Sequence, residues 1–431
     1  MLPLGPPRAL RPRRALRRRR LLGLALVSAG LGASGGLAAC GDTSGILFFD
    51  GGVNGAEATP DAGNDGSETD ATLPSADSPS DSPTDVSSRE AGDGRSFSDE
   101  GEVRPSDATP ETTVDVVSAD VAFEASPGAA DAGPLPPSCA PGGPGMTNCG
   151  YGGSGSGSCG VSLRVEGGTF YRTYDNDGGG PTNEANPATL SSFQLDKYLV
   201  TVGRFRQFVA AWNGGAGYLP AAASGKHIHL NGGLGLEDEA NPGIYETGWS
   251  SDWNSAAYVD PTDANLTCGG EDGFGDAWTP TPSGQENLPI GCVSWYEAYA
   301  FCIWDGGFLP SEAEWEYAAA AGSQQREFPW GSVDPGDSVP SLYVISEGGI
   351  SDVGYAYLGV GYWGQYDLVG EVFEWSVDAY APYSACTDCA NLTASASRVV
   401  RGGDYLFPAA RNSSGPKSRF DDIGFRCARS P

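Results

Sequence analysis

One short segment, YDLVGEVFEWSVD at residues 366–378, alternates carboxylates with large apolar side chains. Asp367 and Glu374 flank Gly370, a residue type that permits a tight turn and lets backbone carbonyls point inward. Two carboxylates and turn carbonyls are the oxygen ligands that Ca²⁺ takes. The segment therefore predicts a calcium site. The alternative is an amphipathic strand whose acidic face is solvated.

Two further groups of residues have side chains that could do chemistry. His227 and His229, the only histidines, stand two apart and would form part of a transition-metal site, although we expect an exposed pair. Cys386 and Cys389 are separated by two residues, a spacing found in redox-active pairs, although we expect a structural pair.

Three stretches predict the helices that would position these groups. Residues 202–212 carry apolar side chains at helical spacing after Thr201, a plausible N-cap residue. Residues 295–302 repeat that spacing, and Ser311 and Glu314 have the spacing of a capping box at the start of a third helix. The abundant glycines elsewhere predict many turns, and thus a loop-rich domain that also contains strands.

Five blocks occur in a fixed order: VSWYEAYAFCIWDGGFLPSEAEWEYAAAAG, FPWG, YDLVGEVFEW, RVVRGGDY and GFRCA. Together with the earlier FQLDKYLVTVGRFRQF, they closely resemble the formylglycine-generating enzyme family, also called the sulfatase-modifying factor family, over about residues 163 to 429. The resemblance implies an α+β domain with the formylglycine-generating-enzyme fold, which is C-type-lectin-like and loop-rich with few helices.

The resemblance also implies a structural calcium ion and a disulfide. Calcium would be held by the side chains of Asp367 and Glu374 and by the carbonyls of Gly370 and Val372, with Glu371 outside the ligand set.

Cys302 and Cys427 match family positions that pair with each other. A bond between them would close a loop of about 125 residues. In the chain-entropy model such a bond would contribute on the order of 4 to 5 kcal/mol to the free energy of unfolding. Arg401 and Arg426 we expect to be buried partners of acids.

The enzymes of this family oxidise a substrate cysteine to formylglycine, using oxygen and copper held by two thiols. Here Phe407 and Asn412 stand at those two positions, and no cysteine occurs between Cys389 and Cys427. Phenylalanine cannot bind copper, so we expect neither copper nor this reaction.

A binding or recognition role is the first hypothesis, with an unknown peptide, protein or glycan ligand. Its candidate groove contains Tyr405, Phe407 and Trp375. The alternative is an enzyme of the family, either a formylglycine-generating oxidase or another metal-dependent oxidase.

The N-terminal part of the chain predicts export and membrane attachment. Residues 1–39 have a basic region, an apolar run and small residues before Cys40, which resembles a bacterial lipoprotein signal. Lipidated Cys40 would anchor the protein at the cell envelope or surface, and a plain cleaved signal peptide is the alternative. Residues 40–138 form an acidic Ser/Thr/Pro/Asp linker that we expect to be disordered.

Two parts follow the linker. Residues 139–160 form a Gly/Cys-rich lead-in, and residues 161–431 form the sulfatase-modifying-factor-like domain. Removal of the eight arginines of the signal leaves 17 basic against 55 acidic side chains, a net charge of −38. Such a charge disfavours nucleic acid as a partner.

Overall fold

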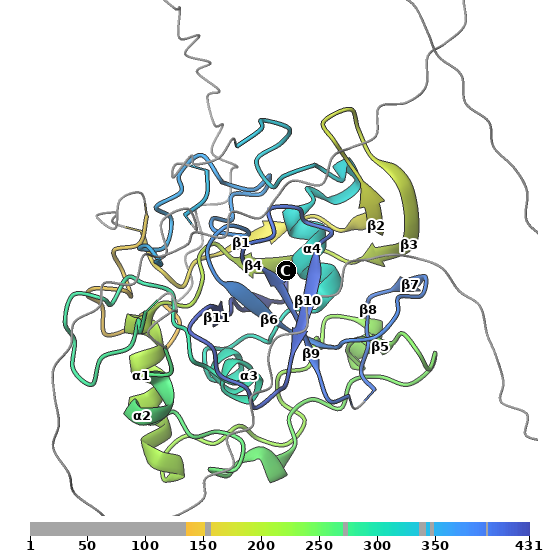
Figure 1. Cartoon of the computed structure of the whole chain (residues 1–431). Coiled ribbons are helices and arrows are strands. Elements are labelled where there is room, and N and C mark those ends of the chain that lie inside the picture. The colour runs from red at the N-terminus through yellow and green to blue at the C-terminus, as the bar shows by residue number, and fades with distance from the viewer. Residues whose placement is uncertain (1–134, 151–156, 270–274, 336–341, 345–348, 394) are drawn as a thin grey trace, which may run out of the picture. The chain divides into compact units, whose positions relative to one another are not determined.

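The computed structural model describes residues 135–150, 157–269, 275–335, 342–344, 349–393 and 395–431 (Figure 1). The predicted signal peptide, Cys40 and nearly all of the predicted linker lie outside these residues. Ser138, the last linker residue, is buried, and its N–H donates to Asp305 Oδ1 at 3.0 Å. Packing against the domain therefore begins slightly before the predicted boundary. In the described part of the chain, no helix has both the length and the apolar character needed to cross a bilayer.

The strands are short and form four small sheets. Their orders are β1-β4-β12, β10-β9-β6-β11, β2-β3-β7 and β5-β8. The bounds are β1 Ser162–Val165, β2 Gly168–Asp175, β3 Thr182–Leu190, β4 Phe193–Asp196, β5 Glu237–Asp238, β6 Phe373–Ala379, β7 Cys386–Thr387, β8 Cys389–Ala390, β9 Arg398–Gly402, β10 Arg411–Ser414, β11 Ile423–Gly424 and β12 Ala428–Arg429.

The three predicted helices are confirmed. They are α1 (Val202–Trp212), α3 (Trp295–Trp304) and α4 (Glu312–Ala319), and a further short helix, α2, spans Asp263–Leu266. The hydroxyl of Thr201 caps α1, and Ser311 with Glu314 forms the expected capping box of α4. A second capping box, Ser294 with Glu297, opens α3.

The sheet that contains β6 and β9 lies at the centre of the domain, and α3 and α4 pack against it (Figure 1). All seven residues of β6 are buried, because β9 and β11 flank this strand and helices cover it. The Trp375 indole donates to the carbonyl of Val293 at 3.0 Å, and the Trp295 indole donates to Ser376 at 2.8 Å. The fold is α+β, loop-rich and low in helix, as the sequence predicts.

Four disulfides lie within the described residues, and their cysteines are between 3 and 125 residues apart in sequence. The Cys302–Cys427 bond ties α3 to the C-terminal segment, with an S–S distance of 2.04 Å, as expected. The other pairs are Cys149–Cys159, Cys268–Cys292 and Cys386–Cys389. Cys139 is buried and unpaired, which accounts for the odd cysteine of the predicted mature chain.

Candidate functional site

The carboxylate of Glu374, a predicted calcium ligand, is held by an arginine. Glu374 lies near the start of β6 and is fully buried, and both of its oxygens accept hydrogen bonds from Arg426, at 2.7 and 2.9 Å. Arg426 also donates to the carbonyls of Tyr366 and Asp367 at 2.9 and 3.0 Å. This pairing satisfies the negative charge of Glu374 internally and speaks against it as a calcium ligand. Arg426 is the buried partner that the sequence predicts.

The side chain of Asp367 accepts a hydrogen bond from a backbone N–H, whereas that of Glu374 accepts from an arginine. Its backbone is left-handed (φ 57°), its side chain is buried, and Oδ2 accepts the N–H of Gly354 at 2.6 Å. Burial raises the pKa of Asp367 to about 6. Burial, and then the charge of Asp367, raise the pKa of Glu371 well above its ordinary value. Asp367 and Glu371 are thus two buried carboxylates, and the charge of Asp367 disfavours that of Glu371, so a nearby cation would stabilise the charged forms.

The turn that contains Gly370 and Val372 presents backbone carbonyl oxygens. The carbonyl of Gly370 accepts from Val344 at 2.8 Å, and that of Val372 accepts from Gly403 at 3.2 Å. A carbonyl oxygen has two lone pairs, so neither bond prevents it from also binding a metal. Asp367 and Glu371 with these turn carbonyls are thus a second candidate donor set for a cation, beside the predicted set that contains Asp367 and Glu374. The sequence resemblance places Glu371 outside the ligand set, where it replaces the usual Asn, and the structure shows that this side chain is buried.

Phe407, which the sequence resemblance places at the position of the first catalytic thiol, lies on the surface. It follows β9, and 51% of it is exposed. Its ring stacks on Phe328 with centroids 5.4 Å apart, and Phe328 stacks on Trp330 at 5.1 Å. We call Phe407, Phe328 and Trp330 the ring stack. Asn412, which the resemblance places at the second thiol position, lies in β10 and pairs with Val400 of β9.

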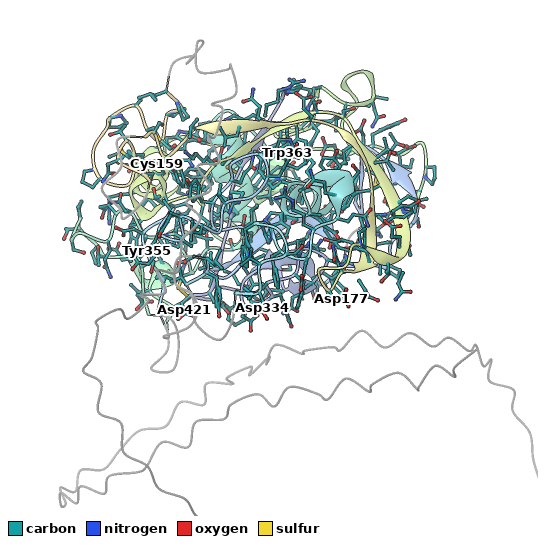
Figure 2. The ribbon with its side chains drawn as sticks, turned by 90° about the horizontal axis from the view of Figure 1, so that it is seen from above. Cys159, Asp177, Asp334, Tyr355, Trp363 and Asp421 are labelled. Atoms are coloured by element: carbon teal, nitrogen blue, oxygen red, sulfur yellow. A yellow bond between two sulfur atoms is a disulfide. The ribbon has the colours of Figure 1, made fainter. Side chains whose placement is uncertain are left out.

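The ring stack has acidic residues beside it. Glu327 directly precedes Phe328, and its pKa is raised by burial and then by the charges of Asp177 and Asp334. Asp177 and Asp334 lie along the same edge of the domain in Figure 2. The exposed aromatic surface is therefore next to negative charge.

The predicted groove needs one correction. Trp375 is fully buried in β6, with its indole N–H bonded to Val293, so it cannot line an accessible surface. Both faces of this central strand are covered, so all of its side chains are buried, including the carboxylates that alternate with its apolar residues. Tyr405 is half-buried and packs edge-to-face on Phe373 at 5.9 Å, so the exposed member of the predicted trio is Phe407.

The expectation of an exposed histidine pair was wrong. His227 is fully buried: Nδ1 lies 3.1 Å from Glu246 Oε2, and Nε2 lies 3.1 Å from Glu314 Oε2. These two carboxylates raise the pKa of His227 to about 10, against the opposing effect of burial. Both ring nitrogens are occupied, so His227 acts as a buried cation that holds α4 and not as a metal ligand. His229 is half-buried, with a ring centroid 6.3 Å from that of His227.

Arg401 is likewise buried, as predicted, and forms ion pairs with Glu316 and, at 3.6 Å, with Glu312. The interior of the domain therefore carries several arginine–carboxylate pairs. Two of these pairs, those of Arg401 in β9 and Arg411 in β10, fix helix α4 to these two strands.

A family model and the sequences of known proteins agree on the family. Residues 154–431 match the model of the sulfatase-modifying factor enzyme 1-like domain. The formylglycine-generating enzyme of Thermomonospora curvata is 30% identical over 307 residues, which cover 62% of this chain and 93% of that protein. Inactive C-alpha-formylglycine-generating enzyme 2 of Mus musculus is 34% identical over 163 residues, covering 33% of this chain and 49% of that protein.

Among solved structures, PvdO from Pseudomonas aeruginosa is similar, with 22% identity and a TM-score of 0.41, and the match covers 64% of this chain and 99% of that one. The match to the family model spans more than half of the chain and includes every block quoted above. The chain therefore belongs to the family of the sulfatase-modifying factor enzyme 1-like domain.

Proposed function

We propose that the chain is a recognition module in which the family scaffold presents an aromatic surface where the enzymes carry their copper-binding thiols. The observation that carries this proposal is Phe407, which stands at the first thiol position, is half-exposed and stacks on Phe328. A phenyl ring supplies neither a thiolate for copper nor a partner for thiol exchange. It does supply apolar area and a π-face for contact with a ligand.

The names of related proteins support this reading. Relatives from Mus musculus and Bos taurus are named as inactive formylglycine-generating enzymes, so loss of the reaction has a precedent among the proteins this chain resembles. We extend that property to this chain because Phe407 and Asn412 replace both thiols. We also propose that the fold is related to C-type lectin domains, in keeping with a binding role.

The ligand is a peptide, protein or glycan that contacts the ring stack. Stacked aromatic rings bind sugar faces and apolar side chains alike. The negative charges of Asp177, Glu327 and Asp334 beside the stack would disfavour acidic ligands.

We propose that a calcium ion stabilises the loop next to this surface. Asp367 and Glu371 would hold it, with the carbonyls of Gly370 and Val372, and the ion would offset the repulsion between the two buried carboxylates. The role is structural. We expect Ca²⁺ to raise the melting temperature of the metal-free wild type, and the variant Glu371→Gln to abolish that rise. A rise that persists in Glu371→Gln but disappears in Glu374→Gln would restore the ligand set expected from the sequence.

We further propose that lipidated Cys40 anchors the protein and that the acidic linker carries the domain away from the membrane. A flexible coil of the linker's length would have a root-mean-square span of about 55 Å. Metabolic labelling with a fatty-acid analogue tests the anchor: label should enter the wild type and be absent from Cys40→Ser. Equal labelling of both proteins would place the lipid elsewhere.

The alternative, a metal-dependent oxidase, would need a metal site away from Phe407. The histidines offered for that purpose do not form one, because Glu246 and Glu314 occupy both ring nitrogens of His227. Recognition is thus the function that the described contacts favour.

A binding measurement tests the proposal. The full chain would be applied to a panel of cysteine-containing sulfatase-type peptides and to a glycan array, beside Phe407→Ala. As a matched control, Tyr355→Ala removes another exposed aromatic ring, 44% exposed in the structure. We expect a ligand whose affinity falls at least about tenfold in Phe407→Ala and is unchanged in Tyr355→Ala. Absence of binding across the panel, or equal binding by all three proteins, would contradict the proposal.

A further inference from the structure

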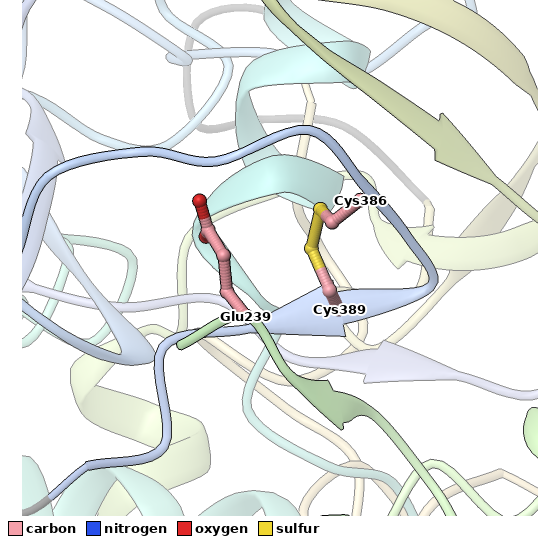
Figure 3. A group of neighbouring side chains, drawn as sticks. All are labelled: Glu239, Cys386 and Cys389. Atoms are coloured by element: carbon pink, nitrogen blue, oxygen red, sulfur yellow. A yellow bond between two sulfur atoms is a disulfide. The ribbon is translucent and has the colours of Figure 1, made fainter. Parts of the chain in front are cut away.

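The Cys386–Cys389 disulfide lies where two small sheets meet. Cys386 is in β7, which extends the β2–β3 sheet by parallel pairing with Ala188. Cys389 is in β8, which pairs with Glu237 of β5. Figure 3 shows this disulfide with the side chain of Glu239 beside it. The Cys386–Cys389 bond therefore links the sheet of the N-terminal hairpin to the sheet formed by the middle of the chain.

The loop that carries this disulfide is held in place by hydrogen bonds that do not involve sulfur. The N–H of Asp388 donates to Thr189 at 2.9 Å, and its carbonyl accepts from Glu237 at 3.0 Å. The Asp388 carboxylate accepts from the N–H and the hydroxyl of Ser191, at 2.7 and 2.8 Å. If the S–S bond opened, these contacts would keep both cysteines close to their present positions and ready to re-form the bond.

The two sulfurs differ in accessibility. Cys386 is half-buried and stands among exposed neighbours, Ser384, Ala385 and Thr387, whereas Cys389 is 1% exposed. Cys386 is thus the more accessible partner of this bond for an external thiolate. Exchange centres have this asymmetry, with one sulfur that is attacked and one that leaves.

The Cys386–Cys389 bond closes a much shorter loop of the chain than the other disulfides of the described residues. Its cysteines are 3 residues apart, compared with 10, 24 and 125 for the other three. In the chain-entropy model a short loop gains the least stability from its cross-link. Opening Cys386–Cys389 should therefore leave the native fold intact, whereas opening Cys302–Cys427 should not.

Two thiols and a carboxylate also suggest a metal site, because one donor atom from each of Glu239, Cys386 and Cys389 lies within 4.8 Å of the others. The surroundings of Glu239 argue against it. Arg172 donates to both of its oxygens, each at 3.0 Å, and the N–H of Ser384 donates to Oε1 as well. A carboxylate neutralised by a buried guanidinium is a poor ligand for a further cation. Thiol chemistry fits the site better than metal binding.

We propose that Cys386–Cys389 is a thiol–disulfide exchange site that reacts with dithiols while the domain remains folded. One thiolate of the dithiol attacks Sγ of Cys386, the S–S bond breaks, and Cys389 leaves as a thiolate. The second thiolate of the dithiol then attacks the dithiol's other sulfur, which is bonded to Cys386 in the mixed disulfide. Cys386 leaves as a thiolate. The dithiol is oxidised to its disulfide, the protein gains two electrons, and the two protons released by the dithiol end on Cys386 and Cys389.

Graded reduction tests this site. The oxidised full chain would be equilibrated with increasing ratios of reduced to oxidised dithiothreitol, alkylated, and analysed by peptide mass spectrometry. We expect Cys386 and Cys389 to be alkylated at ratios at least about tenfold lower than Cys302 and Cys427, with an unchanged near-ultraviolet circular dichroism spectrum. Cys268–Cys292 is the internal control for exposure, because Cys268 is also half-buried but closes a longer loop.

Two single variants test the direction of attack. With the remaining thiol activated as a mixed disulfide with a chromophoric thiol, Cys389→Ser should exchange with dithiothreitol rapidly at Cys386. Cys386→Ser should exchange slowly at Cys389. The same exchange reaction would be measured with a protein dithiol. Comparison of its exchange rate with that of dithiothreitol distinguishes a protein reductant from a small one.

Two results would overturn the proposal. One is opening of Cys386–Cys389 only at ratios that also open Cys268–Cys292 or unfold the domain. The other is protection of the reduced pair from alkylation by stoichiometric Zn²⁺, which would assign the cluster to metal binding instead.

Discussion

The interior around Glu374 and the surface around Phe407 are both built from blocks that match the family, but they have diverged to different degrees. In the interior, Arg426 holds Glu374 through two hydrogen bonds, and a disulfide joins Cys302 to Cys427, the residue that follows Arg426. At the surface, the half-exposed ring of Phe407 lies where the sequence resemblance expects a thiol. Under the proposed function, the residues that hold the scaffold were retained and the residues of the reaction were replaced.

Removal of the central disulfide should have the largest effect on the interior. Cys302→Ala with Cys427→Ala should lower the free energy of unfolding by up to about 4 to 5 kcal/mol, because the bond closes a long loop of the unfolded chain. Chemical denaturation measures this difference. Cys386→Ala with Cys389→Ala is the control, and its effect should be much smaller. Equal losses would show that loop length does not govern these bonds.

Breaking the buried ion pair comes next. Arg426→Ala leaves the carboxylate of Glu374 buried without a partner and should cost about 3 to 5 kcal/mol of unfolding free energy. In the double variant Arg426→Met/Glu374→Met, two apolar side chains replace the pair, and much of the stability should return. Arg164→Ala, which removes an exposed ion pair with Glu166, should leave the melting temperature unchanged. If Arg426→Ala is as stable as Arg164→Ala, the pair does not hold the scaffold.

The buried cation His227 should give the domain a pH dependence. The pKa of His227 in the folded protein is raised from an ordinary value of 6.5 to about 10. Its contribution is therefore fully present below pH 6.5 and is lost as the pH rises through 10. His227→Gln should cost about 3 kcal/mol at pH 6 and progressively less toward pH 10.

Denaturation at several pH values measures this change, with His229→Gln as the control for a half-buried ring. If the cost of His227→Gln were constant between pH 6 and pH 10, the charged form of His227 would not be the stabilising one.

At the surface, the smallest effect on stability is expected. Phe407→Ala removes a half-exposed ring and should change the free energy of unfolding by less than about 1 kcal/mol. Its large effect should be on ligand binding. A loss of several kcal/mol in thermal or chemical unfolding would mean that Phe407 belongs to the core and would erase the contrast with Glu374.

Much of the scaffold could be predicted from the sequence because the signals are local. The capping box of Ser311 and Glu314 spans one helical turn, and the paired Cys302 and Cys427 lie in blocks that resemble the family. The sequence also contains the unrecognised box of Ser294 and Glu297, which has the same spacing.

The errors arose where partners are distant in the chain. Glu246 and Glu314 lie 19 and 87 residues from His227, so a polar KHIH segment gave no sign of burial. Trp375 was assigned to a groove by analogy with the place where the enzymes of the family hold a peptide, but the whole of β6 is buried.

The most direct test of the central claim is an assay for the lost reaction. The full chain, folded oxidatively with Ca²⁺, would be incubated with a sulfatase-type cysteine peptide, copper and oxygen. Peptide mass would report conversion of thiol to aldehyde, beside the enzyme of Thermomonospora curvata as a positive control. We predict no conversion by this chain and full conversion by the control. Conversion by this chain would show that the oxidation does not need a thiol at the position of Phe407, and would contradict the proposal that the scaffold has lost its chemistry.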